Sequence, residues 1–159
     1  MGLDATVYCN CFESGRLKEP PPNSSLVYVA PDGSLDYKSE DLDVLLVFDT
    51  WLRESACEHE DGISQHHYIG NIALVGLLRE ELKRESEKLP ILLEKVLYSG
   101  SHAGDYLSLE DVSGLQAELN VLAEFAASDE KMQAYVEEFR IQMQELIEAA
   151  LSAGKRISF

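Results

Sequence analysis

The chain has 159 residues, of which 45% are hydrophobic and 26% are charged, which is typical of a folded globular domain rather than a disordered segment. Its formal net charge is −16 and is concentrated in two segments. Residues 36–61 carry nine acidic and two basic residues, and residues 105–148 carry eleven acidic and two basic residues. A field of this sign repels nucleic acids and anionic membranes and attracts basic proteins. We therefore expect no nucleic-acid or membrane partner.

Length and cysteine usage give the broad setting of the chain. Its length fits one domain over residues 1–159. No stretch reaches the roughly 20 apolar residues that a membrane span needs, and residues 1–4 lack the features of a secretory signal. Three cysteines, an odd number, are typical of a reducing compartment. These features together predict a cytoplasmic protein.

The first part of the chain predicts strands and turns. Residues 4–12 alternate weakly and are rich in Thr, Val, Tyr and Phe, which favours a strand. Residues 13–25 contain three consecutive prolines and predict a loop. Residues 26–30 and 34–37 flank the turn sequence Pro31-Asp32-Gly33, and the three segments together predict a short hairpin.

The next segment is ambiguous between helix and strand. Ser39 can cap a helix whose first turn is acidic, in agreement with the helix dipole. Residues 44–48 are equally consistent with a buried strand, because a short apolar run fits both structures. Residues 57–70 are polar and predict a loop, with one extended piece near residues 63–68.

The remainder of the chain predicts helices. Asn71 caps a helix that continues to Lys88, and Pro90 fits the first turn of the next helix, to residue 98. Ser108 and Asp111 form a capping box for a helix through residue 125.

The last helix and the C-terminus complete the predicted fold. Ser128 caps the longest helix and Gly154 ends it, after which residues 155–159 alternate as a strand does. We therefore predict an α+β domain, in which a small, mainly antiparallel sheet of the N-terminal strand, the hairpin and the C-terminal strand packs against four or five helices.

Two short motifs have the chemistry of a metal site. Cys9-x-Cys11 lies in the predicted first strand, where alternate residues share a face, and Cys57-x-His59 has the same spacing. Together they could supply four ligands to a tetrahedral zinc ion. However, structural zinc motifs usually separate their cysteines by two to four residues, and cysteine is commonly buried as a small hydrophobic residue. The sequence thus favours buried cysteines and no cofactor, with metal as the alternative.

Histidines and acidic residues concentrate in residues 57–68 and 102–105. Histidine next to a carboxylate can act as an acid or base, or can bind a metal. No spacing matches a metalloprotease helix, a nucleophile elbow or a phosphate-binding loop. We therefore expect a protein that is not an enzyme, in which His102 and Asp105 bond to the backbone and order their loop.

The excess negative charge is the main functional signal. A net charge of about 2 to 8 suffices for the solubility of a small domain, and the excess is explained if it steers a basic partner into contact. Aromatic residues close to the acidic ones could anchor such an interface. The predicted partner-binding residues are Glu40, Asp41, Asp43, Trp51, Glu58, Glu60, Asp61, Tyr68, His102 and Asp105.

The C-terminal half also resembles a known family. Residues 87–100, the capped acidic and apolar helix that follows, and the closing residues 146–159 occur in an order that resembles the bacterial immunity proteins classed as type 70 in polymorphic toxin systems. The similarity covers residues 71–159, and it implies a cytoplasmic protein that binds and neutralises a cognate toxin without catalytic residues of its own.

Composition and resemblance together predict an immunity protein that occludes a basic toxin domain by charge-guided steric blockade. Two alternatives stay open at this point. One is a metal-binding or hydrolytic enzyme that uses residues 57–68 and 102–105, and the other is a regulatory interaction module. A homodimer is a further open alternative.

Overall fold

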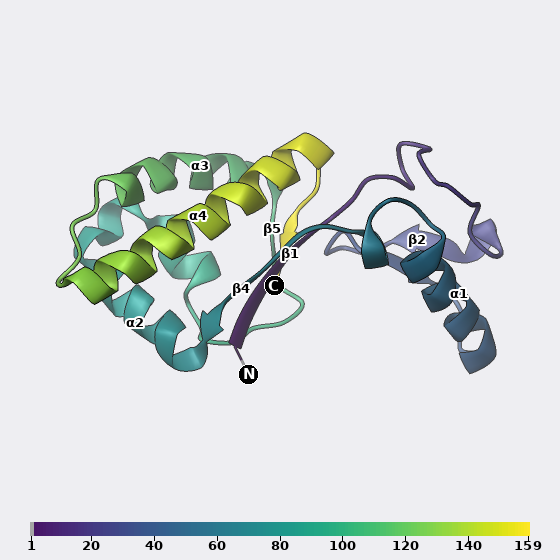
Figure 1. The fold of residues 1–159 in the computed structure, drawn as a ribbon, viewed down its shortest axis with the longest axis horizontal. Coiled ribbons are helices and arrows are strands. Elements are labelled where there is room, and N and C mark those ends of the chain that lie inside the picture. Colours follow the sequence, from purple (N-terminus) through teal and green to yellow (C-terminus); the bar gives the residue numbers. More distant parts are fainter. Residues whose placement is uncertain (1) are drawn as a thin grey trace.

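The structure is a computed structural model that describes residues 2–159. It confirms the α+β fold and has two parts (Figure 1). Helices α2 (Ile72–Leu82), α3 (Leu109–Ala123) and α4 (Glu130–Ala153) pack together at one end, and helix α1 (Leu42–Glu54) with strand β2 (Val27–Val29) lies at the other. Residues 9–62, which leave the main sheet and return to it, are called the α1 lobe below.

The main sheet is antiparallel and has the strand order β4-β1-β6-β5. Strand β1 (Gly2–Tyr8) pairs along its whole length with β4 (Ile63–Asn71), from Gly2 opposite Asn71 to Tyr8 opposite Ile63. The short strands β6 (Ile157–Ser158) and β5 (Tyr106–Leu107) complete the sheet. The predicted N-terminal and C-terminal strands are therefore confirmed.

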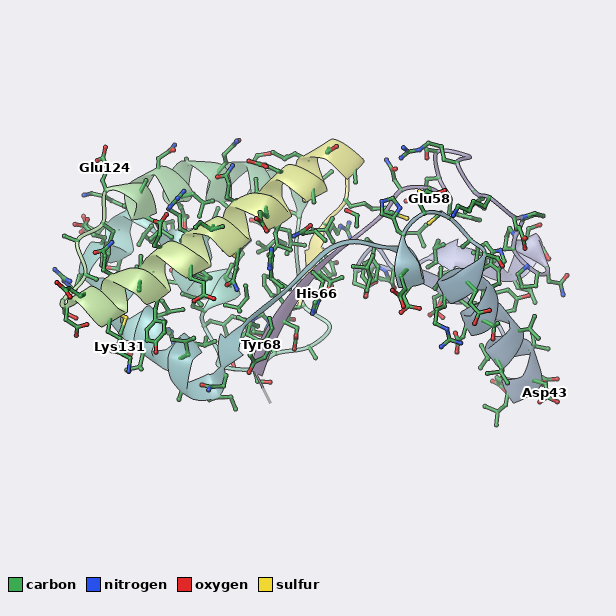
Figure 2. All side chains as sticks on the ribbon, viewed as in Figure 1. Asp43, Glu58, His66, Tyr68, Glu124 and Lys131 are labelled. Atoms are coloured by element: carbon green, nitrogen blue, oxygen red, sulfur yellow. The ribbon has the colours of Figure 1, made fainter. Side chains whose placement is uncertain are left out.

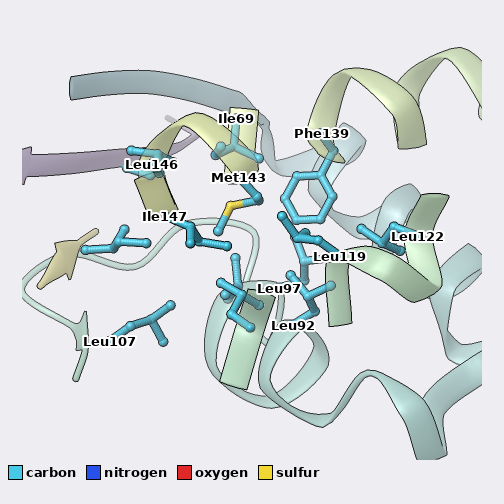
Figure 3. Packing of buried hydrophobic residues seen from close by; sticks show 14 of the residues in the cluster. Ile69, Leu92, Leu97, Leu107, Leu119, Leu122, Phe139, Met143, Leu146 and Ile147 are labelled. Carbon is cyan, nitrogen blue, oxygen red and sulfur yellow. The ribbon is translucent and has the colours of Figure 1, made fainter. Parts of the chain in front are cut away.

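One face of the sheet is covered by helices. In β1, Leu3, Ala5 and Val7 are fully buried, whereas the intervening residues Asp4 and Thr6 are on the opposite, more exposed face. Figure 3 shows the core that they join, in which Met143 and Ile147 pack close to Leu97. This core, which contains twenty-five buried hydrophobic residues, is the larger of two clusters.

The helices of the core begin close to their predicted positions. Helix α2 (Ile72–Leu82) is capped by Asn71, and helix α3 (Leu109–Ala123) begins with the predicted capping box of Ser108 and Asp111. Helix α4 (Glu130–Ala153) ends at Gly154, which has a φ of 63°. The elements between α2 and α3 are a 3₁₀ segment (Lys83–Lys88) and a π-helical segment (Leu92–Val96).

Several predicted helix boundaries were wrong, among them that of the helix after Pro90, which ends at Val96 in a π-helical segment rather than at residue 98. The cap of α4 is Asp129 rather than Ser128, because the Asp129 side chain accepts from the Met132 N–H. Helix α2 ends at Leu82 instead of continuing to Lys88, since Glu85 leaves the helical conformation with φ −121° and ψ 34°. Helix α3 ends at Ala123 rather than residue 125.

The α1 lobe contains the hairpin and one helix. Strands β2 (Val27–Val29) and β3 (Leu35–Tyr37) form the predicted hairpin, followed by helix α1 (Leu42–Glu54), so the strand alternative for residues 44–48 was wrong. The hairpin forms its own two-stranded sheet, which corrects the expectation that it joins the main sheet. Asp41 rather than Ser39 caps α1. Two 3₁₀ turns (Ser24–Leu26 and Glu60–Gly62) flank these elements.

Two other predictions near the lobe need correction. Strand β1 ends at Tyr8, so Cys9 and Cys11 lie beyond the strand rather than in it. Residues 63–71 form a nine-residue strand, whereas the polar sequence had predicted a loop with only one extended piece. This strand is at the edge of the sheet, where a polar exposed face is tolerated.

The C-terminal end of α4 attaches the lobe to the core. The Lys155 ammonium, which is buried, donates to the Gly33 carbonyl at 3.1 Å and pairs with Glu13 at 2.5 Å. Arg156 donates to the Pro31 carbonyl, and the Asn10 amide donates to the Ala153 carbonyl at 2.8 Å. Within residues 2–159, no helix is both long and apolar enough to cross a membrane.

Glu118 is a buried carboxylate that the sequence did not single out. Its side chain is 5% exposed and its two oxygens accept from the backbone N–H groups of Ile91 (2.8 Å) and Leu92 (2.9 Å). These groups belong to the first turn after Pro90, where helical N–H groups have no partner in their own helix. Glu118 of α3 thus caps the neighbouring helical segment through a tertiary contact.

Replacing Glu118 by alanine should lower the free energy of unfolding by about 2–3 kcal/mol, because two N–H donors lose their acceptor in a buried position. Urea denaturation followed by circular dichroism measures this change. Gln116→Ala, at an exposed position of the same helix, is the matched control and should change the free energy of unfolding by less than about 0.5 kcal/mol. Equal effects of the two substitutions would contradict a capping role for Glu118.

The stability that Glu118 confers should also depend on pH. Burial raises the pKa of this carboxyl, although the two backbone N–H groups oppose the rise. Because the pKa is raised in the folded state, the pH-dependent contribution of this carboxyl to the free energy of unfolding is largest below its ordinary pKa. This contribution is lost as the pH rises through the pKa of the folded state. The unfolding free energy of the wild type should therefore fall relative to that of Glu118→Gln between about pH 4 and pH 7. A difference that stays constant over this range would refute the assignment.

Candidate metal centre and the acidic surfaces

Four potential metal ligands meet where the α1 lobe joins the sheet. Cys9, Cys11, Cys57 and His59 each offer one ligand atom, and these four atoms all lie within 4.8 Å of one another. From the sequence we named the same four residues as candidate ligands, but we favoured buried cysteines over a metal site. Their convergence is a result of the fold, because about 46 residues of chain separate the two motifs.

Three of the six distances between ligand atoms in this cluster match those of a tetrahedral zinc site, and all six are within 4.8 Å. The Sγ atoms of Cys9 and Cys57 are 3.8 Å apart, and the His59 Nδ1 atom is 3.5 Å from Cys11 Sγ and 3.7 Å from Cys57 Sγ. Zinc bonds of about 2.3 Å to sulfur and about 2.0–2.1 Å to nitrogen, at tetrahedral angles, place two sulfurs about 3.8 Å apart and sulfur and nitrogen about 3.6 Å apart. The cluster thus matches the ion without rearrangement of these pairs.

A turn after strand β1 presents the first two ligands. The chain leaves the sheet at Tyr8 and reverses over residues 11–15, with backbone hydrogen bonds from Ser14 N to Asn10 O and from Arg16 N to Cys11 O. In an extended strand, Cys9 and Cys11 would lie on one face, with their Cα atoms about 6.6 Å apart and their side chains parallel. The turn instead brings both sulfurs towards a common point, which explains why a spacing of one residue suffices.

The second pair of ligands follows helix α1. The chain ends the helix with bonds from Ser55 N and Ala56 N to the Trp51 carbonyl, and Cys57 follows at once. The His59 N–H is directed at Cys57 Sγ at 3.4 Å, a contact that would stabilise a thiolate there. Asp61, with a φ of 51°, then turns the chain into β4.

The thiols are held in surroundings that disfavour negative charge without a cation. Burial, with a further contribution from the neighbouring thiols, raises the pKa of Cys9 to about 12, and burial also raises the pKa of Cys11. A bound divalent cation reverses this balance because it coordinates the deprotonated sulfur. Three soft thiolates and one imidazole suit zinc better than calcium or magnesium, which prefer oxygen ligands.

The remaining histidines do not join this cluster. His66 contacts Thr6 Oγ1 through Nδ1 at 3.0 Å on the exposed face of the sheet. His67 points to the opposite face and bonds Glu145 of α4 through Nε2 at 2.7 Å. His66 is thus close to Asp4, at 3.6 Å, whereas His67 contacts Glu145 on the other face of the sheet. The two histidines therefore do not form the combined acid–base site that the enzyme alternative assumed.

His102 orders its loop, as predicted. Its Nε2 atom is 3.0 Å from the Val96 carbonyl, and its ring lies between those of Tyr98 and Phe159, with centroid distances of 4.7 and 4.9 Å. Its Nδ1 atom is 3.3 Å from Asp105, whose carbonyl accepts from the Phe159 N–H. His102 and Asp105 thus anchor the C-terminus to the loop.

Eight of the ten predicted partner-binding residues are exposed on several surfaces, whereas the side chains of Trp51 and His102 are buried. Glu40, Asp41 and Asp43 are exposed at the start of α1, and Glu58 and Glu60 are exposed beside the cysteine and histidine cluster. Asp61 is part of the turn into β4 and is exposed as well. Tyr68 and Asp105, also exposed, belong to β4 and to the loop before β5.

Trp51 belongs to the core of the lobe rather than to its surface. The side chain is 7% exposed, its Nε1 atom donates to the Glu19 carbonyl at 3.1 Å, and its ring packs against that of Phe48. Its apolar surface is already covered within the chain, so Trp51 supports the lobe from inside.

The two acidic segments lie in different parts of the molecule (Figure 2). Asp43 marks the outer end of α1, and Glu124 and Lys131 lie at the far end of the helical layer. Residues 36–61 therefore form one negative surface on the lobe and residues 105–148 another on α3 and α4. A single partner face would involve one of these surfaces, not their sum.

Comparison of the chain with protein-family models, with curated proteins and with solved structures gave no match. The resemblance over residues 71–159 therefore stays a prediction.

Proposed function

We propose that the protein binds one zinc ion through Cys9, Cys11, Cys57 and His59, and that this ion fixes the α1 lobe to the sheet. The observation that carries the proposal is the approach of four ligand atoms to within 4.8 Å of one another, with pairwise distances suited to tetrahedral zinc.

The proposed site is structural rather than catalytic. Four protein ligands complete the tetrahedral coordination of zinc, whereas a catalytic zinc keeps one position for water or substrate. Cys9 and Cys11 are buried, which limits access of a substrate to the ion. This argument favours a role in folding over the hydrolytic alternative.

The lobe is the part of the molecule that such an ion would stabilise. Its own cluster contains four buried hydrophobic residues, namely Tyr37, Phe48, Trp51 and Ala56. A core this small seldom supports an independent fold, and small domains commonly use metals as an additional constraint. The ligands lie at both ends of residues 9–62, so the ion closes the lobe at its base.

A second proposal concerns what the stabilised lobe does. We propose that it serves protein binding, with neutralisation of a basic cognate toxin as the particular role that the family resemblance suggests. The exposed acidic side chains of Glu40, Asp41 and Asp43 on the lobe support a basic partner. The signature of charge-guided binding is an association rate that falls steeply as salt concentration rises.

Protein purified without added metal and without chelators should contain about one zinc per chain, measured by mass spectrometry of the metal. Replacing zinc by cobalt should produce the visible absorption of a tetrahedral thiolate site. Cys57→Ser and Cys11→Ser should each lose most of the metal, whereas His66→Ala, which alters an exposed histidine outside the cluster, should retain it. Protein that takes up far less than one equivalent under reducing conditions would refute the proposal.

Removing the ion should loosen the lobe selectively. After chelation, limited proteolysis should cleave within residues 9–62 at least about tenfold faster, because the lobe opens while the larger core stays folded. Far-ultraviolet circular dichroism should retain most of the helical signal, and added zinc should restore resistance. Equal cleavage rates with and without chelator would show that the lobe does not depend on metal.

A further inference from the structure

Helix α1 has an uncovered apolar face. Leu42, Leu46 and Val47, called the outer face of α1 below, are 80%, 63% and 56% exposed. Leu42 and Leu46 are four residues apart and so lie on the same side of the helix, whereas Val47, one residue after Leu46, lies about a quarter turn further around the helix axis. Single exposed apolar residues are ordinary on protein surfaces, but three within six residues give the exposed side of one helix an unusually large apolar area.

The opposite face of the same helix is already packed. Phe48 and Trp51 are buried, and the ring of Phe48 stacks on that of Tyr37 with centroids 4.7 Å apart. An exposed helix of a globular protein usually has one apolar stripe and one polar face. Helix α1 instead is apolar on two sides, so the outer face is not needed for packing within residues 2–159.

Acidic side chains surround the outer face. Asp43, Asp49 and Glu54 are exposed on α1, and Glu40 and Asp41 precede its first turn. The single basic residue of the helix, Arg53, lies 3.8 Å from Glu54 and is thereby partly neutralised. The patch therefore combines apolar contact area with a negative rim.

We propose that the outer face of α1 docks a cationic, amphipathic helical segment of another protein. Such a segment places apolar side chains on Leu42, Leu46 and Val47, while its Lys or Arg residues pair with Asp43 and the other acidic residues of the rim. Charge complementarity selects this occupant. A second copy of the chain would oppose two negative rims, and an anionic membrane would be repelled in the same way.

The position of the helix suits this role. Figure 1 places α1 at the end of the molecule away from α2, α3 and α4, and Asp43 lies at its outer end in Figure 2. The inference rests on the proposed zinc site only for the fixed orientation of the lobe, since the apolar and acidic residues belong to one helix. It names the surface and the partner chemistry that the proposed binding role requires.

The test uses the full-length, zinc-loaded protein and a 14-residue helical peptide of leucine and lysine, compared with a scrambled peptide of equal charge. The triple variant Leu42→Gln, Leu46→Gln, Val47→Gln keeps every charge and should weaken binding at least about tenfold. The matched control Leu109→Gln with Ile141→Gln removes exposed apolar residues from the other acidic segment and should change affinity less than about twofold. Hydrogen exchange should show protection by the peptide at residues 42–54.

Three results would overturn the inference. These are equal affinity for the scrambled peptide, equal affinity of the triple variant, and peptide protection located on α3 and α4 instead of α1. Circular dichroism and zinc content, measured on the same samples, verify that each variant is folded. Protein that binds the peptide at α1 but fails to take up zinc would refute the metal proposal alone, whereas normal zinc content without binding at α1 would refute the docking proposal alone. Self-association through α1, measured by analytical ultracentrifugation, would assign the outer face of α1 to a second copy of the chain. This result would also refute the docking proposal.

Discussion

The antiparallel pairing of β1 with β4 is the constraint on which the rest of this structure depends. Tyr8 is the last residue of β1 and lies opposite Ile63, the first residue of β4. The two chain segments just outside this pair must therefore start side by side, and the bond from Cys9 N to the Gly62 carbonyl at 2.7 Å continues the pairing by one step. Cys9 and Cys11 consequently meet Cys57 and His59.

This pairing also defines the α1 lobe. Residues 9–62 connect the two neighbouring strands β1 and β4, and this long connection has a small core of its own. Closing so long an excursion costs conformational entropy, which a metal ion at its base would offset. The contacts of Lys155 and Arg156 with the hairpin turn provide a second attachment, so that the orientation of the lobe is determined at two points.

The distribution of charge has a different meaning in three dimensions than along the chain. The two acidic segments that together account for the net charge lie in different parts of the molecule, and the one on the lobe lies around the three most exposed large apolar side chains within residues 2–159, Leu42, Leu46 and Val47. Repulsion along α3 and α4 is moderated locally, for example by the pairing of Arg140 with Glu137 at 2.6 Å. The proposed binding role therefore concerns the surface of α1 alone.

The sequence by itself determined the local features of this protein. The capping box at Ser108, the cap at Asn71, the left-handed Gly154 and the turn at Pro31-Asp32-Gly33 all depend on residues within a few positions of one another, and each occurs where expected. Local rules were insufficient for β4, because its polar residues are those of an edge strand with one exposed face and resemble a loop.

Tertiary structure alone decided the features that join distant segments. The register of β1 on β4 brings together four potential metal ligands that short-range spacing had disfavoured, and the packing of Trp51 against Phe48 buries an expected interface residue inside the lobe. Glu118 caps a helical segment about 27 residues earlier in the chain, a contact with no local signature. Side-chain spacing along a chain constrains neighbours within a turn or a strand, whereas contacts across tens of residues depend on the pairing and packing that the whole chain adopts.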